Sequence, residues 1–465
     1  MSIENHAAIH WDHALIKKYD VSGPRYTSYP TANLFHDDFA HEQYMQVATN
    51  EKSSIAPISL YIHIPFCENI CYYCACNKVV TRDKSKAREY LEHLKKEIAL
   101  RGEIHANRPV TQLHFGGGTP TFLSTSELTE LMVSLGRHFN LSTADSREYS
   151  IELDPRTVDD EYISLLKGLG FNRVSLGIQD FHPPVQKAIN REQSVDMVQD
   201  LLKSIRQYRF DSISFDLIYG LPHQSVASFT QTLATVIALN PDRLSVYNYA
   251  HLPERFKTQR SIDRLTLPTG QEKLAIMEHI GNTLTDAGYE YIGMDHFVKP
   301  DDELAKARFN GRLQRNFQGY STCLATDLIG LGSSSITSFS DTYSQNSKDL
   351  TEYYRLVNSG KLPIVKGYPL TVKNTLHREI IMSLACRLAL NIQDIELLFS
   401  IKFDEEFNYL MPRLSEFEED GLIELSDALI TVTDTGRLML RQICMVFDEY
   451  LSKNNAGGTK FSKAM

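Results

Sequence analysis

The sequence predicts an α/β protein whose parallel sheet is open or curled into a partial (β/α)6 barrel. Six β-rich runs alternate with segments of helical composition from about residue 57 to 290. Most of these runs are rich in Val, Ile, Leu or aromatic residues throughout, as strands buried on both faces are. Strands that are separated by helices are typical of a parallel α/β sheet.

The expected strands lie, in chain order, at residues 57–64, 110–115, 149–154, 172–177, 212–218 and 243–249. The helices expected between them lie at residues 84–104, 126–139, 158–169, 195–208 and 225–238. In the first of these helices, apolar side chains including Leu91, Leu94 and Ile98 share one side. Upstream, residues 20–33 contain too much Pro and Gly for a helix, so we expect an extended N-terminal arm.

The pattern changes beyond residue 370. Two helices are expected at 370–390 and 404–418, followed by a hairpin of two short apolar runs and a last helix at about 434–452. This order predicts a mostly helical, winged-helix-like C-terminal domain. The expected division is an arm at 1–51, a core domain at 52–287, a barrel extension and connector at 288–370, and the C-terminal domain at 371–465.

Composition narrows the class of protein. The chain has 465 residues, which is too many for one ordinary core. A net charge of −10 argues against a dedicated nucleic-acid binder, although a local arginine cluster can still hold a small anionic substrate. No run of 18 apolar residues and no apolar signal segment occur, so we expect no membrane span and a cytoplasmic location. Nothing demands a partner chain, and a monomer is expected.

Four of the seven cysteines fall within ten residues. Cys67, Cys71 and Cys74 form a C-x3-C-x2-C motif directly after the first expected strand. Three close thiolates without a second Cys or His pair suit a four-iron cluster that keeps one iron open. The alternative is a zinc knuckle completed by Cys76 or His63. The scattered Cys323, Cys386 and Cys444 are expected to be buried apolar residues.

The cysteine motif, with Tyr73 as its aromatic residue, resembles the signature of the radical S-adenosylmethionine (SAM) family. The resemblance implies a radical-SAM barrel. It also implies that the open iron chelates the methionine part of SAM, and that one electron then releases a 5′-deoxyadenosyl radical. The protein positions and shields this chemistry.

Two further signals fit this resemblance. Gly116-Gly117-Gly118-Thr119-Pro120 follows the second strand and is similar to the family's glycine-rich stretch, although a plain tight turn is the alternative. Ligands of barrel-like folds sit at the carboxyl ends of strands. Those ends carry Cys67, Gly117, Glu152, Gln179, Asp216 and Ala250. For the two acidic residues, salt bridges to core-facing arginines are the alternative.

Longer runs resemble the oxygen-independent coproporphyrinogen III oxidase family. They include GPRYTSYPTA, LYIHIPFCENICYYCACNK, GGGTPT, SIELDPR, GIQDF, NREQ, DLIYGLP, NPDRLSVYNYAHLP, IGMDHF and RNFQGY. The resemblance implies decarboxylation of two of the four propionates of coproporphyrinogen III to vinyl groups, giving protoporphyrinogen IX in haem synthesis. It also implies a [4Fe-4S] cluster, two SAM molecules side by side and a cytoplasmic one-electron donor.

The resemblance carries roles to single residues. The cluster would be held by Cys67, Cys71 and Cys74. The first SAM would contact Tyr61, Gly117, Glu152, Ala250 and Ile336. The second would contact Tyr73, Gly118, Thr119, Gln179, Arg191 and Asp216. Cys76 would be a catalytic thiol that does not bind the cluster, and Ala75 stands where glycine is more usual.

Substrate carboxylates need cations, and the candidates are Arg25 in the arm, Arg191 and the run 254–260. For that run, a solvated helix face is the preferred interpretation. His63, His114 and His296 are expected to be structural rather than proton donors. Two other activities compete with the decarboxylase: a haem chaperone and a haem-degrading radical methyltransferase. The GPRYTSYPTA arm and Cys76 disfavour the chaperone.

Overall fold

The computed structural model describes residues 9–51, 54–322 and 327–453. Within these ranges one sheet holds thirteen strands, and its central part is parallel. The parallel strands lie in the order β9-β8-β7-β6-β4-β1-β14. Their bounds are β1 (Ile58–Ile64), β4 (Pro109–Gly117), β6 (Glu148–Leu153), β7 (Arg173–Gln179), β8 (Ser212–Tyr219), β9 (Arg243–Asn248) and β14 (Asp327–Leu331). The six strands predicted from the sequence are confirmed.

β14 was not predicted from the sequence, although it lies parallel to β1 and ends the parallel part of the sheet. The sequence signal for this strand is weak because the strand is short and contains Gly330. A Cβ atom at Gly330 would stand 2.5 Å from the carbonyl oxygen of Ile336, so the close approach of the next strand requires glycine there.

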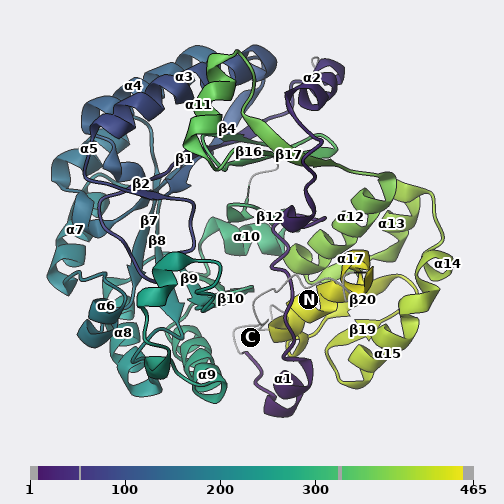
Figure 1. The fold of residues 1–465 in the computed structure, drawn as a ribbon. Helices are drawn as coiled ribbons and strands as arrows, with labels where there is room; N and C mark the ends of the chain where they lie inside the picture. The colour runs from purple at the N-terminus through teal and green to yellow at the C-terminus, as the bar shows by residue number, and fades with distance from the viewer. Residues whose placement is uncertain (1–8, 52–53, 323–326, 454–465) are drawn as a thin grey trace.

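Helices cover the outer face of the parallel strands, as Figure 1 shows. The predicted helices are confirmed as α3 (Ser85–His105), α4 (Thr125–His138), α5 (Asp160–Gly168), α7 (Val195–Gln207) and α8 (Val226–Leu239). Four of them begin with a Ser or Asp side chain that accepts a backbone N–H: Ser124, Asp159, Ser194 and Ser225. Two further helices come after the β7 and β9 segments, the short α6 (Pro183–Ala188) and the longer α9 (Gly270–Asp286).

Antiparallel strands extend the sheet at both edges and leave it open. Beyond β14 come β15 (Ile336–Phe339), β16 (Thr342–Asn346) and β17 (Ile364–Pro369). Beyond β9 come β11 (His296–Val298) and β10 (Glu290–Gly293). In the described part of the chain the edge strands β10 and β17 do not pair, which confirms a partial barrel.

The C-terminal domain has the predicted winged-helix order. It runs through α12 (Val372–Arg387), β18 (Ala389–Asn391), α13 (Ile392–Phe399), α14 (Phe403–Phe407), α15 (Met411–Glu419), β19 (Ile423–Leu425) and β20 (Leu429–Val432). The three strands form one antiparallel sheet in the order β18-β20-β19.

Two helix predictions in this domain were wrong. The helix expected at 404–418 is interrupted by a 3-10 turn at Asn408–Leu410, just before Pro412, which cannot donate a helical hydrogen bond. The helix expected at 434–452 is divided into a 3-10 turn (Gly436–Met439), α16 (Leu440–Val446) and α17 (Glu449–Lys453). The break at Asp448 occurs because its carboxylate accepts from the Tyr450 N–H and from Tyr26.

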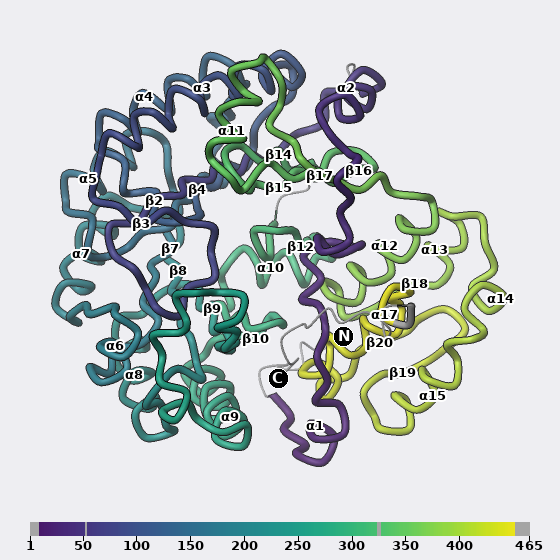
Figure 2. The backbone as a smooth tube through the Cα atoms, in the orientation of Figure 1, coloured from purple at the N-terminus to yellow at the C-terminus, as the bar shows by residue number. Residues whose placement is uncertain are grey.

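The N-terminal arm runs between the barrel and the C-terminal domain, as the purple trace in Figure 2 shows. It connects α1 (His13–Tyr19) to α2 (His41–Asn50). The Tyr26 hydroxyl donates to Asp448 at 2.9 Å, and the side chain of Gln442 donates to the carbonyl of Tyr19 at 2.8 Å. The predicted extended arm is therefore a packed segment that is fixed to the end of the chain.

A buried carboxylate ties the extension to the barrel. Glu97 of α3 is 0% exposed and accepts from Asn346 at 2.7 Å, from the Gly332 N–H at 2.8 Å and from Tyr353 at 2.7 Å. The guanidinium of Arg101 lies 3.9 Å away and is also fully buried. Glu97 thus joins α3 to the loop after β14, to β16 and to α11 (Leu350–Asn358).

No described helix is long and apolar enough to cross a membrane.

We expect Glu97→Ala to lower the free energy of unfolding by about 3–5 kcal/mol, because it leaves Arg101 buried without a counter-charge. Chemical denaturation of the purified chain measures this loss. Glu103→Ala on the exposed face of the same helix is the matched control, with a change within about 0.5 kcal/mol. Equal stability of the two variants would contradict the assignment.

Candidate active site

The three cysteines of the motif lie on a loop at the carboxyl end of the parallel strands. Cys67 ends β2 (Phe66–Cys67), which pairs with β3 (Val79–Val80), so both ends of the loop are fixed by strand pairing. The side chains of Cys67 and Cys71 are buried, that of Cys74 is half-buried, and Cys76 is exposed.

Neighbouring segments hold the backbone of this loop. The side chain of Asn190 donates to the carbonyl of Ile70 at 2.7 Å. The side chain of Gln259 donates to the carbonyl of Tyr73 at 3.0 Å. The carbonyl of Cys74 accepts from Lys78 at 3.0 Å and from Thr258 at 3.1 Å. The loop has little secondary structure of its own, so these bonds define its shape.

The run 254–260 therefore has a role that the sequence did not indicate. It contains most of a 3-10 helix at Lys257–Ser261, and Gln259 is only 2% exposed. The preferred interpretation as a solvated helix face was wrong for Thr258 and Gln259, because both side chains turn inward to the cysteine loop.

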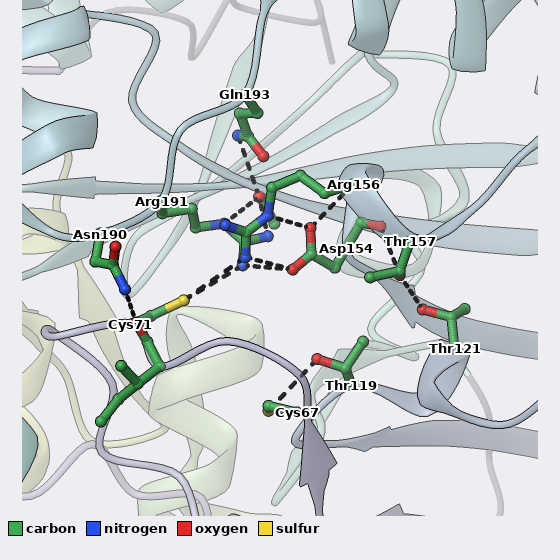
Figure 3. Close-up of polar contacts among 12 residues, drawn as sticks. Cys67, Cys71, Thr119, Thr121, Asp154, Arg156, Thr157, Asn190, Arg191 and Gln193 are labelled. Atoms are coloured by element: carbon green, nitrogen blue, oxygen red, sulfur yellow. Dashed lines mark hydrogen bonds and ion pairs between the residues drawn. The ribbon is translucent and has the colours of Figure 1, made fainter. Parts of the chain in front are cut away.

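A buried charge cluster stands behind Cys71, as Figure 3 shows. Asp154 follows β6 and pairs with Arg156 at 2.7 Å and with Arg191 at 3.0 Å. Burial acts to raise the pKa of Asp154, but Arg191 and then Arg156 hold it below the usual value. The two guanidinium groups lie 3.7 Å (Arg191) and 3.9 Å (Arg156) from the Cys71 sulfur. Two positive charges therefore stand beside this sulfur.

The other two sulfurs have different surroundings. Burial raises the pKa of Cys67 to about 11, opposed by a hydrogen bond from Thr119 at 3.5 Å. A hydrogen bond from Cys76 lowers the pKa of Cys74 to about 6, against the effect of burial and with the help of Lys78. Cysteine ligands bind a metal as thiolates, so all three thiols would lose their protons when a metal centre binds.

The glycine-rich stretch passes close to the cysteine loop. Gly117 has φ +115°, a conformation that favours glycine. A Cβ atom at Gly118 would stand 2.8 Å from the carbonyl oxygen of Phe66 and 3.1 Å from the Cys67 sulfur. These contacts leave no room for a side chain beside the sulfur, so the stretch is more than a plain turn. It forms a cradle in which backbone groups face the site.

Two adjoining cavities surround this cradle. The cysteine-loop cavity, of about 290 Å³, is lined by the three motif cysteines. The barrel cavity, of about 520 Å³, runs between the strands of the sheet. The two share six lining residues, namely Cys76, Gly117, Glu152, Ser175, Asp216 and Tyr247.

The residues that resemblance assigned to two SAM molecules line these two cavities, and Gly117, Glu152 and Asp216 line both of them. The barrel cavity is lined by Tyr61, Gly117, Glu152 and Ile336 from the first set. The cysteine-loop cavity is lined by the whole second set: Tyr73, Gly118, Thr119, Gln179, Arg191 and Asp216. Ala250 lines neither cavity, and its carbonyl accepts a hydrogen bond from Gln259 at 3.2 Å.

The two acidic residues at the strand ends have no arginine partner in the described chain. Glu152 accepts from His114 at 3.1 Å, and Asp216 accepts from Ser175 at 2.9 Å. Burial, followed by the nearby Glu152, raises the pKa of Asp216 to about 6. Both carboxylates face the shared part of the cavities, where they can accept from hydroxyl or amine groups of a ligand.

The three histidines beside the motifs are hydrogen-bonded, as predicted. His63 contacts Tyr61 at 3.1 Å and the carbonyl of Asn77 at 3.0 Å. The His114 ring contacts Ser150 at 2.6 Å in addition to Glu152. The His296 ring contacts the carbonyl of Met294 at 2.8 Å.

Among the scattered cysteines, Cys386 and Cys444 are buried as predicted, and Cys323 lies outside the described residues. Arg25, expected to bind substrate, pairs with Asp295 at 2.5 Å and stacks 5.5 Å from the centre of the Tyr247 ring. Tyr247 lines both cavities, so the arm reaches the mouth of the site.

The donor set fits an iron–sulfur cluster better than a zinc ion. Among the residues that the structure describes, no three His, Cys, Asp or Glu side chains converge closely enough to hold a single metal ion. His63 is engaged with Tyr61 and Asn77, and Cys76 stands beside Cys74 rather than opposite it. A four-iron cube is larger than one ion, and three spread thiolates on one loop suit it.

Sequence reasoning missed Asp154, Arg156 and Gln259. Asp154 directly follows a strand, so its place at the carboxyl edge was a usable signal. Arg156 comes two residues later, and its role depends on the turn that brings it back to Asp154. Gln259 lies 186 residues from the carbonyl that it binds, and no local pattern indicates such a contact.

Comparison with known proteins agrees with this geometry. Residues 61–236 match the radical SAM superfamily, and residues 370–439 match the HemN C-terminal domain. A Pseudomonas aeruginosa protein named oxygen-independent coproporphyrinogen III oxidase is 50% identical, over 96% of this chain and 97% of the relative. An Escherichia coli K12 protein of the same name is 46% identical, over 98% and 99%.

The solved coproporphyrinogen III oxidase of Escherichia coli, described as a radical SAM enzyme, superimposes with a TM-score of 0.91. It is 45% identical, and the match covers 95% of this chain and 99% of that structure. Such agreement extends to the arm, the barrel and the C-terminal domain. The chain therefore belongs to the oxygen-independent coproporphyrinogen III oxidase family of the radical SAM superfamily.

Proposed function

We infer that this chain is an oxygen-independent coproporphyrinogen III oxidase. It converts two propionate side chains of coproporphyrinogen III to vinyl groups and yields protoporphyrinogen IX in haem synthesis. The observation that carries this function is the cysteine loop at the barrel mouth, in a chain that matches the family over nearly its whole length. The same match favours the decarboxylase over a haem chaperone or a haem-degrading methyltransferase.

A [4Fe-4S] cluster with SAM supplies the deoxyadenosyl radical that takes a hydrogen from a propionate β-carbon. We propose that Cys67, Cys71 and Cys74 hold this cluster. Arg191 and Arg156 support the proposal, because their charges stand beside the Cys71 sulfur and reduce the electrostatic cost of a buried thiolate.

We propose two SAM molecules, one for each set of lining residues. Two adjoining cavities that share Gly117, Glu152 and Asp216 support this number. The guanidinium of Arg191 is bonded to Asp154 and to the carbonyl of Gly177 at 2.7 Å. It therefore shapes its side of the cysteine-loop cavity rather than presenting a free fork. Cys76 lines both cavities, a suitable place for the proposed catalytic thiol.

We further propose a cytoplasmic monomer that takes electrons from a one-electron donor. Every site residue named above comes from one chain, and the reactive thiols require a reducing compartment. The proposed domain division is 1–51, 52–287, 288–370 and 371–465. The end of β17 at Pro369 and the start of α12 at Val372 support its last boundary.

Anaerobic incubation of the iron- and sulfide-loaded chain with coproporphyrinogen III, dithionite and SAM should yield vinyl product and carbon dioxide. Cys71→Ser should abolish turnover and the cluster absorbance near about 400 nm, since it removes one of three ligands. Absorbance, iron and sulfide content, and product mass are the measurements.

Cys444→Ala, which removes a buried thiol of the C-terminal domain, is the control and should keep both properties. Cys71→Ser protein that retains its cluster and its turnover would contradict the ligand assignment. Stoichiometric haem binding without turnover would indicate a chaperone. Formation of a methylated linear tetrapyrrole would indicate a methyltransferase.

Arg191→Ala should weaken one of two SAM binding events by at least about tenfold, because it opens one wall of the cysteine-loop cavity and removes one of the two arginines that pair with Asp154. Ile336→Ala is the reciprocal variant and should weaken the SAM binding event in the barrel cavity. Calorimetric titration of the cluster-loaded protein with SAM resolves the two. Equal loss of both events in Arg191→Ala would refute this division.

SAM binding should weaken as the pH falls through about 6, the pKa of Asp216. Above that pH the carboxylate is ionised and accepts hydrogen bonds from the ligand, and below it the protonated form is neutral and keeps only part of this acceptor capacity. Titrations on both sides of this pH measure the step. Asp216→Asn should bind less tightly and without the step, so an unchanged pH profile in this variant would exclude Asp216 as its origin.

A further inference from the structure

A third cavity lies between the arm, the C-terminal domain and a hairpin of the extension. The hairpin consists of β12 (Gln314–Asn316) and β13 (Gly319–Ser321). This arginine cavity has a volume of about 440 Å³ and is lined by residues of the arm, the hairpin, β15 and α12. Phe317 and Leu328 line both it and the barrel cavity, so the two adjoin. It shares none of its described lining residues with the cysteine-loop cavity.

Arg315 in this cavity is a buried cation without a matching anion. It is 8% exposed and stands opposite Tyr320 in the hairpin, with its guanidinium carbon 4.7 Å from the ring centre. Its Nε donates to the carbonyl of Arg25 at 3.2 Å, and Nη1 is buried without a hydrogen bond. No described carboxylate lies within ion-pair distance of it. A buried charge left in this state is unfavourable, so the arrangement calls for an anionic ligand.

The acidic residues around Arg315 are engaged with other arginines. Asp327 pairs with Arg108 at 2.7 Å, and Glu379 pairs with Arg387 at 2.8 Å. Asp341, whose side chain is 69% exposed, lies 3.9 Å from Arg378. The cavity wall contains four arginines and three acids, listed together as Arg312, Arg315, Arg378, Arg387, Asp327, Asp341 and Glu379. Because Asp327 is neutralised from outside by Arg108, the wall carries net positive charge.

The charge of Arg315 also affects the neighbouring His296. Burial, and then the positive charge of Arg315, lowers the pKa of His296 to about 4. The His296 ring packs against Tyr320 at 5.2 Å, on the ring that Arg315 also contacts. A neutral His296 therefore adds no further positive charge beside Arg315 at neutral pH.

We propose that Arg315 binds a propionate of the tetrapyrrole that is not decarboxylated. The inference rests on the proposed function, in which coproporphyrinogen III brings four carboxylates and the product keeps two. A reacting propionate must lie beside the SAM at the cysteine loop, whereas the arginine cavity adjoins only the barrel cavity, at the lining residues Phe317 and Leu328. With SAM at the end of the barrel cavity that adjoins the cysteine loop, a macrocycle at the end lined by Phe317 reaches Arg315 with a carboxylate that stays intact. Arg315 is thus a positioning residue for the substrate.

Two porphyrins separate the retained from the reacting carboxylates. Coproporphyrin III has all four propionates. Deuteroporphyrin IX keeps the two retained ones and has hydrogen at both reacting positions. Binding of each to the cluster-loaded, SAM-bound enzyme is measured anaerobically by fluorescence quenching, for the wild type and for Arg315→Met. Neither probe requires turnover.

Arg315→Met should weaken binding of both porphyrins by a similar factor of about ten to a hundred, the loss expected for a charge-assisted hydrogen bond. Its unfolding temperature without porphyrin should be unchanged or higher, because an unpaired buried charge is replaced by an apolar chain of similar size. Arg315→Lys should recover part of the affinity. Arg137→Met, at an exposed site on α4 far from all three cavities, should bind both porphyrins as the wild type does.

Unchanged binding of both porphyrins to a folded Arg315→Met would overturn the inference. Weaker binding of coproporphyrin III alone would also overturn it, because Arg315 would then hold a reacting propionate. If Arg315→Met fails to fold, binding of the two porphyrins is compared in the same way for Arg315→Lys and Arg378→Gln. A wild type that binds both porphyrins yet never forms vinyl product would count against the proposed function and not against this site.

Discussion

The structure depends on holding three sulfur atoms in place on a loop that lacks regular structure. Strand pairing fixes the two ends of the loop, and side chains from two distant segments bind its carbonyl groups. Behind it, Asp154 orients two guanidinium groups toward Cys71. These contacts are buried, so each is stronger than it would be in water, and each would be costly to lose. The barrel serves as the rigid base from which they extend.

The three cavities form a continuous sequence from this loop to the C-terminal domain. The cysteine-loop cavity adjoins the barrel cavity, which adjoins the arginine cavity. The three cysteines of the motif line only the first of these cavities, and Arg315 lines only the last. This order matches a reaction in which a radical forms at one end while a polyanionic macrocycle is anchored at the other. The arm lines the arginine cavity through Thr27 and Ser28, and its Arg25 stacks on Tyr247, which lines the other two cavities.

The sequence allowed the parallel strands and the cysteine motif to be predicted because both depend on local patterns. Runs of buried residues mark the strands, and the spacing of Cys67, Cys71 and Cys74 indicates the cluster. The position of β14 could not be predicted, since a short glycine-containing strand pairs with β1 more than 260 residues earlier in the chain. Gln259 and Arg315 likewise depend on segments that meet only in the folded protein. The C-terminal helices were misjudged where Pro412 and Asp448 interrupt an otherwise helical composition.

The attachment of the arm to the end of the chain has a consequence for biosynthesis. Tyr26 and its partner Asp448 are separated by 422 residues, so this contact forms only after the ribosome has made the chain as far as Asp448. Domains made earlier can fold during synthesis. Until that contact forms, the arm is not fixed between the barrel and the C-terminal domain. Completion of the last helices then fixes the arm in place.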